Sequence, residues 1–384
     1  MKTVKFAQVL KFSENLVKVD KPEEERYVTV LLYGRGVIER EIKEGKVPVA
    51  FTGYKAHAGQ LIISTINARN GAAGIIPAEL EGAVVSKDFP LFDIDHECVD
   101  EQYLLYYLWS DSFIHKAEQN SFGATMPRLH VKPFLNMQMR LPALSEQKRR
   151  AHTLCHVESL LNTQRHLLTK LDELVKSRFV EMFGDCVINQ KHWKTRFLED
   201  IAEVGSSKRV FVEELQETGI PFYRGTEVGA LAEGKPIDPE LFITEEHYNK
   251  LCEATGKPQI GDLLMPSICP DGRIWVVNTD KPFYFKDGRV LWVHSVISGY
   301  NPVFLLYTLK DRIMSDYNSI ASGTTFAELK IFALKKCRVF EVPLELQNRF
   351  AAFVAEVDKS KLAVKQSLEK LETLKKSLMQ QYFG

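Results

Sequence analysis

Apolar residues recur at alternating spacings of three and four in two long segments, one in the middle of the chain and one at its end. The first begins near Pro142–Ser145, with Ser145 as a candidate N-cap, and stops at Phe183, before Gly184. The second runs from about Pro343 to Phe383. Sustained heptads predict two long helices with coiled-coil seams, each of roughly 40 residues and about 60 Å.

The residues expected to pair the two helices are the apolar ones on these stripes. They are Leu154, Val157, Leu161, Leu168 and Leu171 in the first helix, extended by Val175, and Val357, Val364, Leu371, Leu374 and Leu378 in the second, extended by Phe350 and Phe353. Gln164 interrupts the first series. Because a buried Leu or Val contributes about 1.5–3 kcal/mol, we expect the apolar stripes of the two helices to cover each other. The expected direction of pairing is antiparallel. The alternative is that each helix packs on its own globular part.

The two helical segments belong to a repeat that runs along the chain. "LDELVKSRFVEMFG" (171–184) and "LETLKKSLMQQYFG" (371–384) align without a gap and are identical at six of fourteen positions. Further upstream, "AGQLIIS" (58–64) matches "IGDLLMP" (260–266), and "SFGAT" (121–125) matches "ASGTT" (321–325). This order indicates a tandem duplication of a globular part followed by a helix. The expected boundaries are 1–142, 143–185, 186–342 and 343–384.

Each globular part is expected to mix short strands with helices. "GQLIISTI" and "GDLLMPSI" are short apolar runs of the kind that form strands. The turn dipeptides Asn70-Gly71 and Asp271-Gly272 follow them at matching places. Residues 100–118 read as one helix with Asp100 as its N-cap. The predicted fold class is α+β: two such parts, related by a pseudo-twofold axis through an antiparallel helix pair.

Composition and charge set limits on partners. At about 100–200 residues per domain, a length of 384 residues suggests two to three globular domains. A content of 45% hydrophobic and 26% charged residues is ordinary for a globular protein. The net charge is zero, with 17 Lys and Arg against 18 Asp and Glu in residues 1–140 and 19 against 21 in residues 191–341. This is not the basic footprint usual for nucleic-acid binding. We expect no membrane span and no signal peptide, and the six dispersed cysteines suit a reducing cytosol.

No motif in the chain indicates catalysis. There is no phosphate-binding G-x-x-x-x-G-K-[ST] sequence, and "NPVF" (301–304) lacks the second proline of an adenine methyltransferase clamp. "PLFDID" (90–95) offers carboxylates without a lysine at nuclease spacing. His152, His156 and His166 are expected on the solvated face of the first long helix, and the pair His96 and Cys98 has no further local metal ligands.

The order of parts and several motifs resemble the DNA-specificity subunit of type I restriction–modification enzymes. The resemblance is carried by "NARNGAAGIIPAELEGAVVSKDFPLFDID" (67–95), "FGATMPRLHVKPFLNMQMRLPALSEQKR" (122–149) and "LDELVKSRFVEMFGD" (171–185), with "SGTTFAELK" (322–330) and "PLELQNRFAAFVAEVDKSK" (343–361) in the second half. The chain departs from the pattern at Met126-Pro127. The entry into the second long helix also lacks a counterpart of the pair Glu146-Gln147. Both departures weaken the transfer of residue roles from the family at Met126 and Leu346.

The resemblance implies a non-catalytic, cytoplasmic subunit. Each globular part would be a target recognition domain that reads one half of a bipartite double-stranded DNA sequence, and the helix pair would set the spacing. Two methyltransferase subunits would dock on the helices, with motor–nuclease subunits joining through them. S-adenosylmethionine, ATP and Mg would bind to those partners, and this chain would hold no cofactor and no metal. The rival hypotheses are a fused methyltransferase or nuclease, and a purely structural adaptor.

Direct base readout favours Arg, Lys, Asn, Gln, Ser and Thr side chains on loops. The candidates for DNA contact are Asn67, Arg69, Asn70, Lys87, Thr125 and Arg128 in the first part, and Ser207, Lys208, Arg224, Arg273, Thr324 and Thr325 in the second. Because the two parts differ widely in sequence, we expect two different half-sites. Partner subunits would supply the phosphate contacts that the neutral charge of this chain does not.

Overall fold

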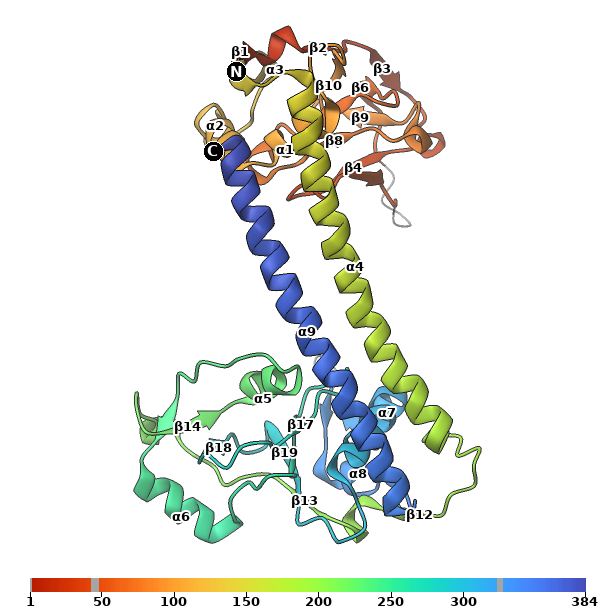
Figure 1. Cartoon of the computed structure of the whole chain (residues 1–384), viewed down its shortest axis with the longest axis vertical. Helices are drawn as coiled ribbons and strands as arrows, with labels where there is room; N and C mark the ends of the chain where they lie inside the picture. Colours follow the sequence, from red (N-terminus) through yellow and green to blue (C-terminus); the bar gives the residue numbers. More distant parts are fainter. Residues whose placement is uncertain (1, 43–47, 323–326) are drawn as a thin grey trace. The chain divides into compact units, whose positions relative to one another are not determined.

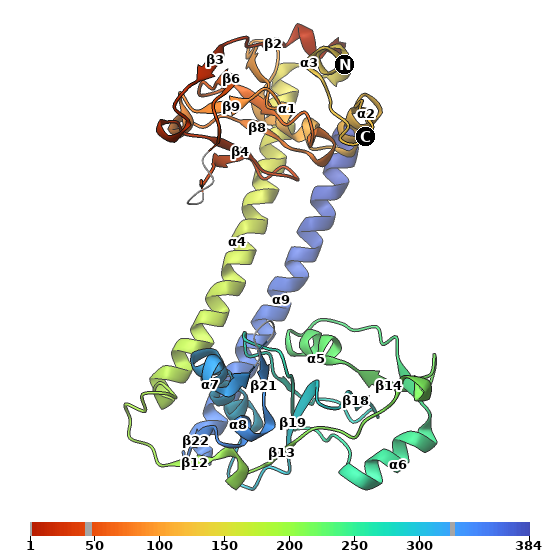
Figure 2. The ribbon, with the colours of Figure 1, turned by 180° about the vertical axis from the view of Figure 1, so that it is seen from behind.

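The computed structural model describes residues 2–42, 48–322 and 327–384 (Figures 1 and 2). Internal contacts divide the chain into two compact units. Unit 1 is Met1–His166 with Val364–Gly384, and unit 2 is Leu167–Ala363. Each unit therefore combines a globular part with a portion of both long helices.

Unit 1 is built from short antiparallel sheets. Its central sheet has the order β2 (Leu10–Phe12), β10 (Leu91–Ile94), β7 (Leu61–Ile63) and β8 (Ala73–Ile75). The other sheets are β3 (Leu16–Val19), β6 (Phe51–Lys55) and β9 (Val84–Ser86); β4 (Val28–Val30) with β5 (Val37–Glu39); and β1 (Lys2–Lys5) with β11 (Gln138–Leu141). All three residues of β7 are buried, as the uniformly apolar run predicts for a central strand.

The predicted helix over 100–118 is wrong as a single element. The structure has α1 (Glu101–Leu108) and α2 (Asp111–Gln119), and later α3 (Val131–Asn136). Asp100 does cap α1, since its side chain accepts a hydrogen bond from the Tyr103 amide. Ser110 caps α2 in the same way and so starts a new helix after Trp109. Ser110 opens the polar stretch Ser110-Asp111-Ser112 after the apolar run 104–109, and apolar residues resume at Phe113, so periodicity alone did not reveal the break.

Unit 2 repeats this plan in its central elements. Its sheet order is β13 (Glu203–Gly205), β19 (Val290–His294), β16 (Leu263–Pro266) and β17 (Trp275–Val276), and β12 (Thr195–Phe197) pairs with β22 (Arg338–Phe340). The helices α7 (Pro302–Ile320) and α8 (Ile331–Lys335) follow, with β20 (Ala321–Ser322) and β21 (Glu328–Leu329) between them. The strand order matches that of unit 1, so the predicted duplication is confirmed as a repeat of architecture.

The repeat diverges on the outer side of the central sheet. Unit 1 has the antiparallel sheet β3-β6-β9, whereas unit 2 has β15 (Phe242–Ile243), β14 (Ile220–Tyr223) and β18 (Tyr284–Phe285), of which β14 and β18 are parallel. Unit 2 also carries α5 (Gly225–Ala232) and α6 (Glu245–Thr255) in this region. The two units therefore share a frame and differ in the loops and layers that it presents.

The two long helices are confirmed. They are α4 (Leu144–Phe183) and α9 (Leu344–Phe383), each of 40 residues. Ser145 is not the N-cap of α4, because the helix already begins at Leu144. Gly184 follows the helix with a φ of +83°, the left-handed conformation in which glycine commonly ends a helix. In each unit the portions of α4 and α9 lie side by side (Figures 1 and 2).

Candidate nucleic-acid interface

A buried glutamine ties the start of α4 to the globular part of unit 1. Gln147 is fully buried. Its Oε1 accepts a hydrogen bond from the Asp100 amide at 2.9 Å, and its Nε2 donates to the carbonyl oxygens of Cys98 at 3.1 Å and Pro142 at 3.0 Å. One side chain thus joins the first turn of α4 to the N-terminus of α1 and to the end of β11.

The same clasp occurs in unit 2. Gln347 is fully buried, accepts a hydrogen bond from the Asn301 amide at 2.9 Å, and donates to the carbonyls of Gly299 at 2.9 Å and Val342 at 2.8 Å. The sequence prediction that the second half lacks the Glu-Gln pair is therefore wrong for the glutamine. Only the acid is replaced, by Leu346, because the glutamine serves buried backbone groups and the acid does not.

The ends of the long helices carry a second repeated device. Phe183, at the end of α4, is fully buried, and its ring centroid lies 4.8 Å from that of Phe304 on α7. Phe383, at the end of α9, lies 5.1 Å from the ring of Tyr103 on α1. Phe304 and Tyr103 occupy corresponding positions of the repeat. The matching segments 171–184 and 371–384 therefore end in equivalent aromatic anchors, that of α4 in unit 2 and that of α9 in unit 1.

Within unit 1 the helices pair antiparallel. Leu154, Val157 and Leu161 of α4 are buried, as is Val364 of α9, and Leu371 and Leu378 are half-buried. Lys375 pairs with Glu158 at 2.6 Å and Arg165 with Glu372 at 3.0 Å. As residue numbers rise along one helix they fall along the other, which defines the direction.

Within unit 2 the same arrangement continues. Leu168 and Leu171 are half-buried, and Val175 and Val357 are buried. The ammonium group of Lys361 on α9 lies 2.7 Å from the carboxylate of Asp172 on α4. Lys361 is only 17% exposed, so this cation sits on the seam itself.

Leu374 does not occupy a seam position. It is 46% exposed, whereas Lys375 is half-buried between Leu371 and Leu378. The half-buried positions of this part of α9 are therefore Leu371, Lys375 and Leu378, separated by four and then three residues. An apolar pattern selects the leucine, but Glu158 supplies a partner that allows a lysine on the seam. In the same way, the buried residue next to Phe350 is Val354, and Phe353 is half-buried.

Three loops of unit 1 meet around one carboxylate. The Arg128 Nε donates to Asp88 Oδ1 at 3.1 Å, and the Thr65 hydroxyl lies 3.4 Å from the same oxygen. Backbone hydrogen bonds join the loops, from the Leu129 amide to the Thr65 carbonyl at 2.8 Å and from the Thr65 amide to the Asp88 carbonyl at 2.8 Å. The sequence prediction named residues in all three loops without knowing that they are neighbours.

The remaining candidates of unit 1 surround this junction. Lys87 precedes Asp88 and is exposed, and Thr125 lies in the exposed loop between Phe122 and Arg128. Asn67 precedes a short 3-10 helix (Ala68–Asn70) that Asn70 ends, and the Asn70 Nδ2 donates to Asn67 Oδ1 at 3.3 Å. Arg69, half-buried in that helix, forms no ion pair with any residue that the structure describes. Unit 1 therefore presents basic and amide side chains on adjoining loops.

The arginines predicted in unit 2 are neutralised by carboxylates. Arg224 donates to Glu227 at 2.6 Å and to Glu240 at 3.2 Å. Burial raises the pKa of Glu227, but hydrogen bonds from Arg224 outweigh it and lower the pKa to about 2. Arg273 lies 2.9 Å from Asp271 and 3.7 Å from Glu233. Both guanidinium groups are thereby engaged in local structure.

The other candidates of unit 2 divide into exposed, buried and undescribed residues. Lys208 is exposed, and its backbone amide donates to the Tyr284 hydroxyl at 2.9 Å. Ser207 is buried and its hydroxyl donates to the Phe285 carbonyl at 2.5 Å, so the prediction that it faces DNA is wrong for this structure. Thr324 and Thr325 lie outside the described residues.

Sequence reasoning missed the exposed apolar side chains beside the unit 1 loops. Tyr33 is 74% exposed, Phe122 61% and Met126 50%. A signal was available in "YGRG" (33–36), where two glycines surround an arginine behind a tyrosine. Isolated exposed apolar residues are ordinary, but aromatic groups next to basic loops suit a nucleic-acid surface.

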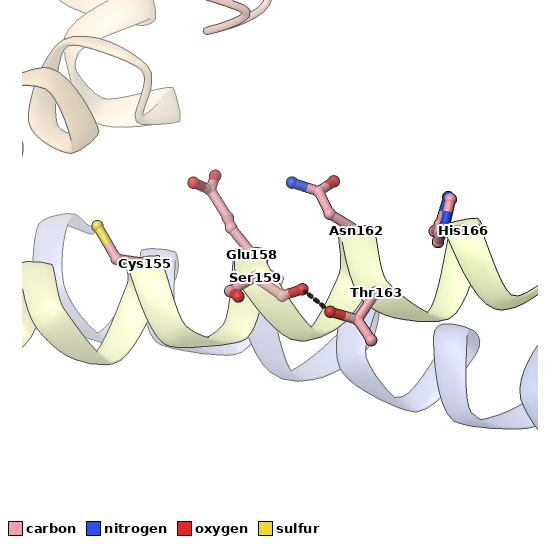
Figure 3. A pocket seen from close by; sticks show the side chains of 6 residues that line it. All are labelled: Cys155, Glu158, Ser159, Asn162, Thr163 and His166. Atoms are coloured by element: carbon pink, nitrogen blue, oxygen red, sulfur yellow. Dashed lines mark hydrogen bonds between the residues drawn. The ribbon is translucent and has the colours of Figure 1, made fainter.

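One shallow depression lies on α4 itself. It has a volume of about 570 Å³ and is lined by Cys155, Glu158, Ser159, Asn162, Thr163 and His166. Figure 3 shows that all six side chains come from this one helix. The exposed His152, His156 and His166 lie on the solvated side of α4, as predicted. Among the described residues, no three His, Cys, Asp or Glu side chains are grouped as metal ligands, and no helix is long and apolar enough to cross a membrane.

Known proteins of one family match this chain. A family model described as "Type I restriction modification DNA specificity domain" matches residues 1–173 and 190–374. The "Type I restriction enzyme MjaVIII specificity subunit" of Methanocaldococcus jannaschii is 23% identical over 318 residues, which cover 77% of this chain and 72% of that protein.

Two solved structures share the fold. One comes from work described as "Structural basis underlying complex assembly and conformational transition of the type I R-M system"; it has a TM-score of 0.57 at 18% identity and covers 100% of this chain and 97% of that one. The other is the S subunit of a type I restriction–modification system from M. genitalium, with a TM-score of 0.56 at 14% identity, covering 100% and 96%. At these identities the likeness concerns the α/β parts and the long helices.

Proposed function

Because the chain belongs to the type I restriction modification DNA specificity family, we propose that each of its globular parts reads one half of a bipartite DNA target. The observation that carries this proposal is the repeat of frame with divergence of loops. Both units have the same central sheet order, the same glutamine clasp and the same aromatic anchor. Their outer layers and polar loops differ, which suits two different half-sites.

The helix pair is proposed to set the spacing between the half-sites. Each helix is continuous over 40 residues, about 60 Å at 1.5 Å per residue. The clasps at the helix starts and the anchors at their ends attach each helix firmly to folded parts. A firmly attached helix transmits a length, whereas a flexible linker does not.

The partners are proposed to be two methyltransferase subunits, with motor–nuclease subunits joining them, in the cytoplasm. These partners would carry S-adenosylmethionine, ATP and Mg. The exposed polar faces of α4 and α9 offer long docking surfaces. Partner subunits would also supply most phosphate contacts, because the net charge of this chain is zero.

Base contacts in unit 1 are proposed for Asn67, Arg69, Asn70, Lys87, Thr125 and Arg128. Asp88 would hold the Arg128 guanidinium in one orientation, which lowers the entropy lost when it binds a base edge. In unit 2 the proposal keeps Lys208. Arg224 and Arg273 would shape loops rather than read bases, since carboxylates already occupy them.

The test is to sequence modified bases in cells that express this chain with its methyltransferase subunits. We expect one bipartite motif with two different halves, absent when the chain is omitted. The variant Arg128→Ala should reduce methylation about 10–100-fold, the effect of losing one base contact. Lys18→Ala removes an exposed lysine that pairs with Asp20 on the same unit and should have little effect. A stable complex that leaves methylation unchanged would contradict the proposal.

A further inference from the structure

Tyr33 combines a strained backbone with an exposed aromatic side chain. Its φ is +60°, in the left-handed region, and its side chain is 74% exposed. That conformation is uncommon for a bulky residue, because the Cβ atom crowds the neighbouring carbonyl oxygen. Glycine or asparagine would adopt the same backbone with less strain. The other described non-glycine residues with positive φ are Asn189, His192 and Ser295, which are smaller or polar.

The strain is maintained by the loop around it. The Tyr33 amide donates to the Asn70 carbonyl at 2.8 Å, and the Gly34 amide donates to the Gly71 carbonyl at 3.2 Å. Gly34 lies so close to Trp109 that an added Cβ would be 2.7 Å from the indole. The Leu31 amide closes the loop onto the Gly36 carbonyl at 2.9 Å. The loop therefore fixes the backbone position from which the exposed tyrosine side chain projects.

Packing within the chain does not explain why a tyrosine stands here. Among the residues that the structure describes, its ring has no aromatic or cationic partner and its hydroxyl has no hydrogen bond. A ring on a residue that is 74% exposed adds little buried apolar surface to the fold. A strained residue whose side chain does not stabilise the fold points to a role outside it.

The side chains beside Tyr33 indicate which kind of molecule it meets. Arg35 is exposed two residues later in the same loop, and Arg69 and Asn70 lie on the turn to which the loop is hydrogen-bonded. Asn67 bonds to Asn70 on that turn. Guanidinium and amide groups beside an exposed aromatic ring suit the phosphates, base edges and thymine methyl groups that a DNA duplex presents in its grooves.

We propose that Tyr33 packs its ring against the groove edge of a base, such as a thymine methyl group, in the DNA half-site that unit 1 reads. The contact is made by the ring and not by the hydroxyl. Tyr33 is thus a specificity-determining residue whose backbone conformation is fixed before DNA binds. This inference rests on the proposed function of unit 1 in DNA recognition.

The experiment uses the full chain in complex with its methyltransferase subunits and a duplex that carries the methylated motif. Equilibrium binding is measured by fluorescence anisotropy for the wild type, Tyr33→Gly and Tyr33→Phe. The matched control is Phe332→Ala, since Phe332 of α8 is also 74% exposed. Melting temperature and co-purification of the methyltransferase are recorded for each variant.

Tyr33→Gly should melt at or above the wild-type temperature, assemble normally and bind the target about 5–100-fold more weakly, as expected for one lost base contact. Tyr33→Phe and Phe332→Ala should bind within about threefold of wild type. For Tyr33→Gly, tolerance to base changes should increase only in the half-site read by unit 1.

Unchanged binding by Tyr33→Gly would overturn the inference. A folded Tyr33→Gly chain that no longer assembles would also overturn it and would assign the ring to a protein partner. If the wild-type complex shows no sequence preference, the proposed function itself fails, and that outcome is distinct from both.

Discussion

The glutamine clasps can be tested by replacing glutamine with leucine at the two clasp positions and at one control position on α4. Gln147→Leu removes the three hydrogen bonds that a fully buried side chain makes, and Gln347→Leu removes the equivalent three. At about 1 kcal/mol of net stabilisation per bond, each variant should lose about 3 kcal/mol, and more where a buried backbone group stays unpaired. In units of this size the loss corresponds to about 6–12 °C in melting temperature.

Gln164→Leu is the matched control. Gln164 lies on the same helix as Gln147, is half-buried, and falls in the apolar series between Leu161 and Leu168. Leucine there extends the seam, so this variant should be neutral or more stable by about 1 kcal/mol.

Thermal unfolding combined with hydrogen exchange distinguishes the three variants. Gln147→Leu should increase exchange at α1, and Gln347→Leu at the start of α7. Equal stabilities for Gln147→Leu and Gln164→Leu would refute the reasoning, because they would mean that the hydrogen bonds of the buried Gln147 side chain contribute no more than the half-buried amide of Gln164 does.

Three further predictions follow from contacts on the helices and in unit 2. Phe383→Ala should destabilise unit 1 by about 3–5 kcal/mol, whereas Leu374→Ala, on an exposed face of the same helix, should cost well under about 1 kcal/mol in chemical unfolding; equal costs would contradict the aromatic anchor. Glu158→Ala should destabilise the seam, because it removes the carboxylate that pairs with the Lys375 cation and accepts the hydrogen bond of the buried Tyr106 hydroxyl. Lys375→Leu should be nearly neutral. If thermal unfolding shows the reverse order of the two variants, this asymmetry is refuted. The pKa of Glu227 in the folded chain is lowered to about 2 from 4.5, so the ionised carboxylate stabilises the fold above about pH 4.5 and this stabilisation is lost as pH falls towards 2. Glu227→Gln should therefore flatten the acid side of a plot of unfolding free energy against pH. An unchanged acid side would exclude the ion pair as its source.

The long helices and the repeat were predictable because both are local or self-referential properties of the sequence. Heptad spacing over 40 residues needs no knowledge of tertiary contacts. The seam was harder to predict at single positions. Lys375 rather than Leu374 faces the partner helix, because Glu158, more than 200 positions away in the chain, neutralises the lysine.

The candidate DNA contacts were predicted as residue types on loops, and the structure sorted them by their partners. Arg128 and Arg273 look alike in sequence, yet Arg128 joins three loops whereas Arg273 closes on the neighbouring Asp271. Ser207 reads as an exposed hydroxyl but is buried against Phe285. Tyr33 was overlooked because a tyrosine that follows Leu31 and Leu32 reads as the end of an apolar run, and its strain is visible only in the backbone.

By itself, then, the sequence determined a duplicated α/β chain with two long amphipathic helices, because periodicity and self-similarity are written in neighbouring residues. The tertiary structure alone decided which polar groups are consumed inside the fold and which remain available. Gln147 and Gln347 show this most clearly, since each is a polar residue at the start of a helix whose three partners lie up to 49 positions away. Whether a polar side chain is structural or functional depends on where its partners come from, and that is settled only when distant segments meet.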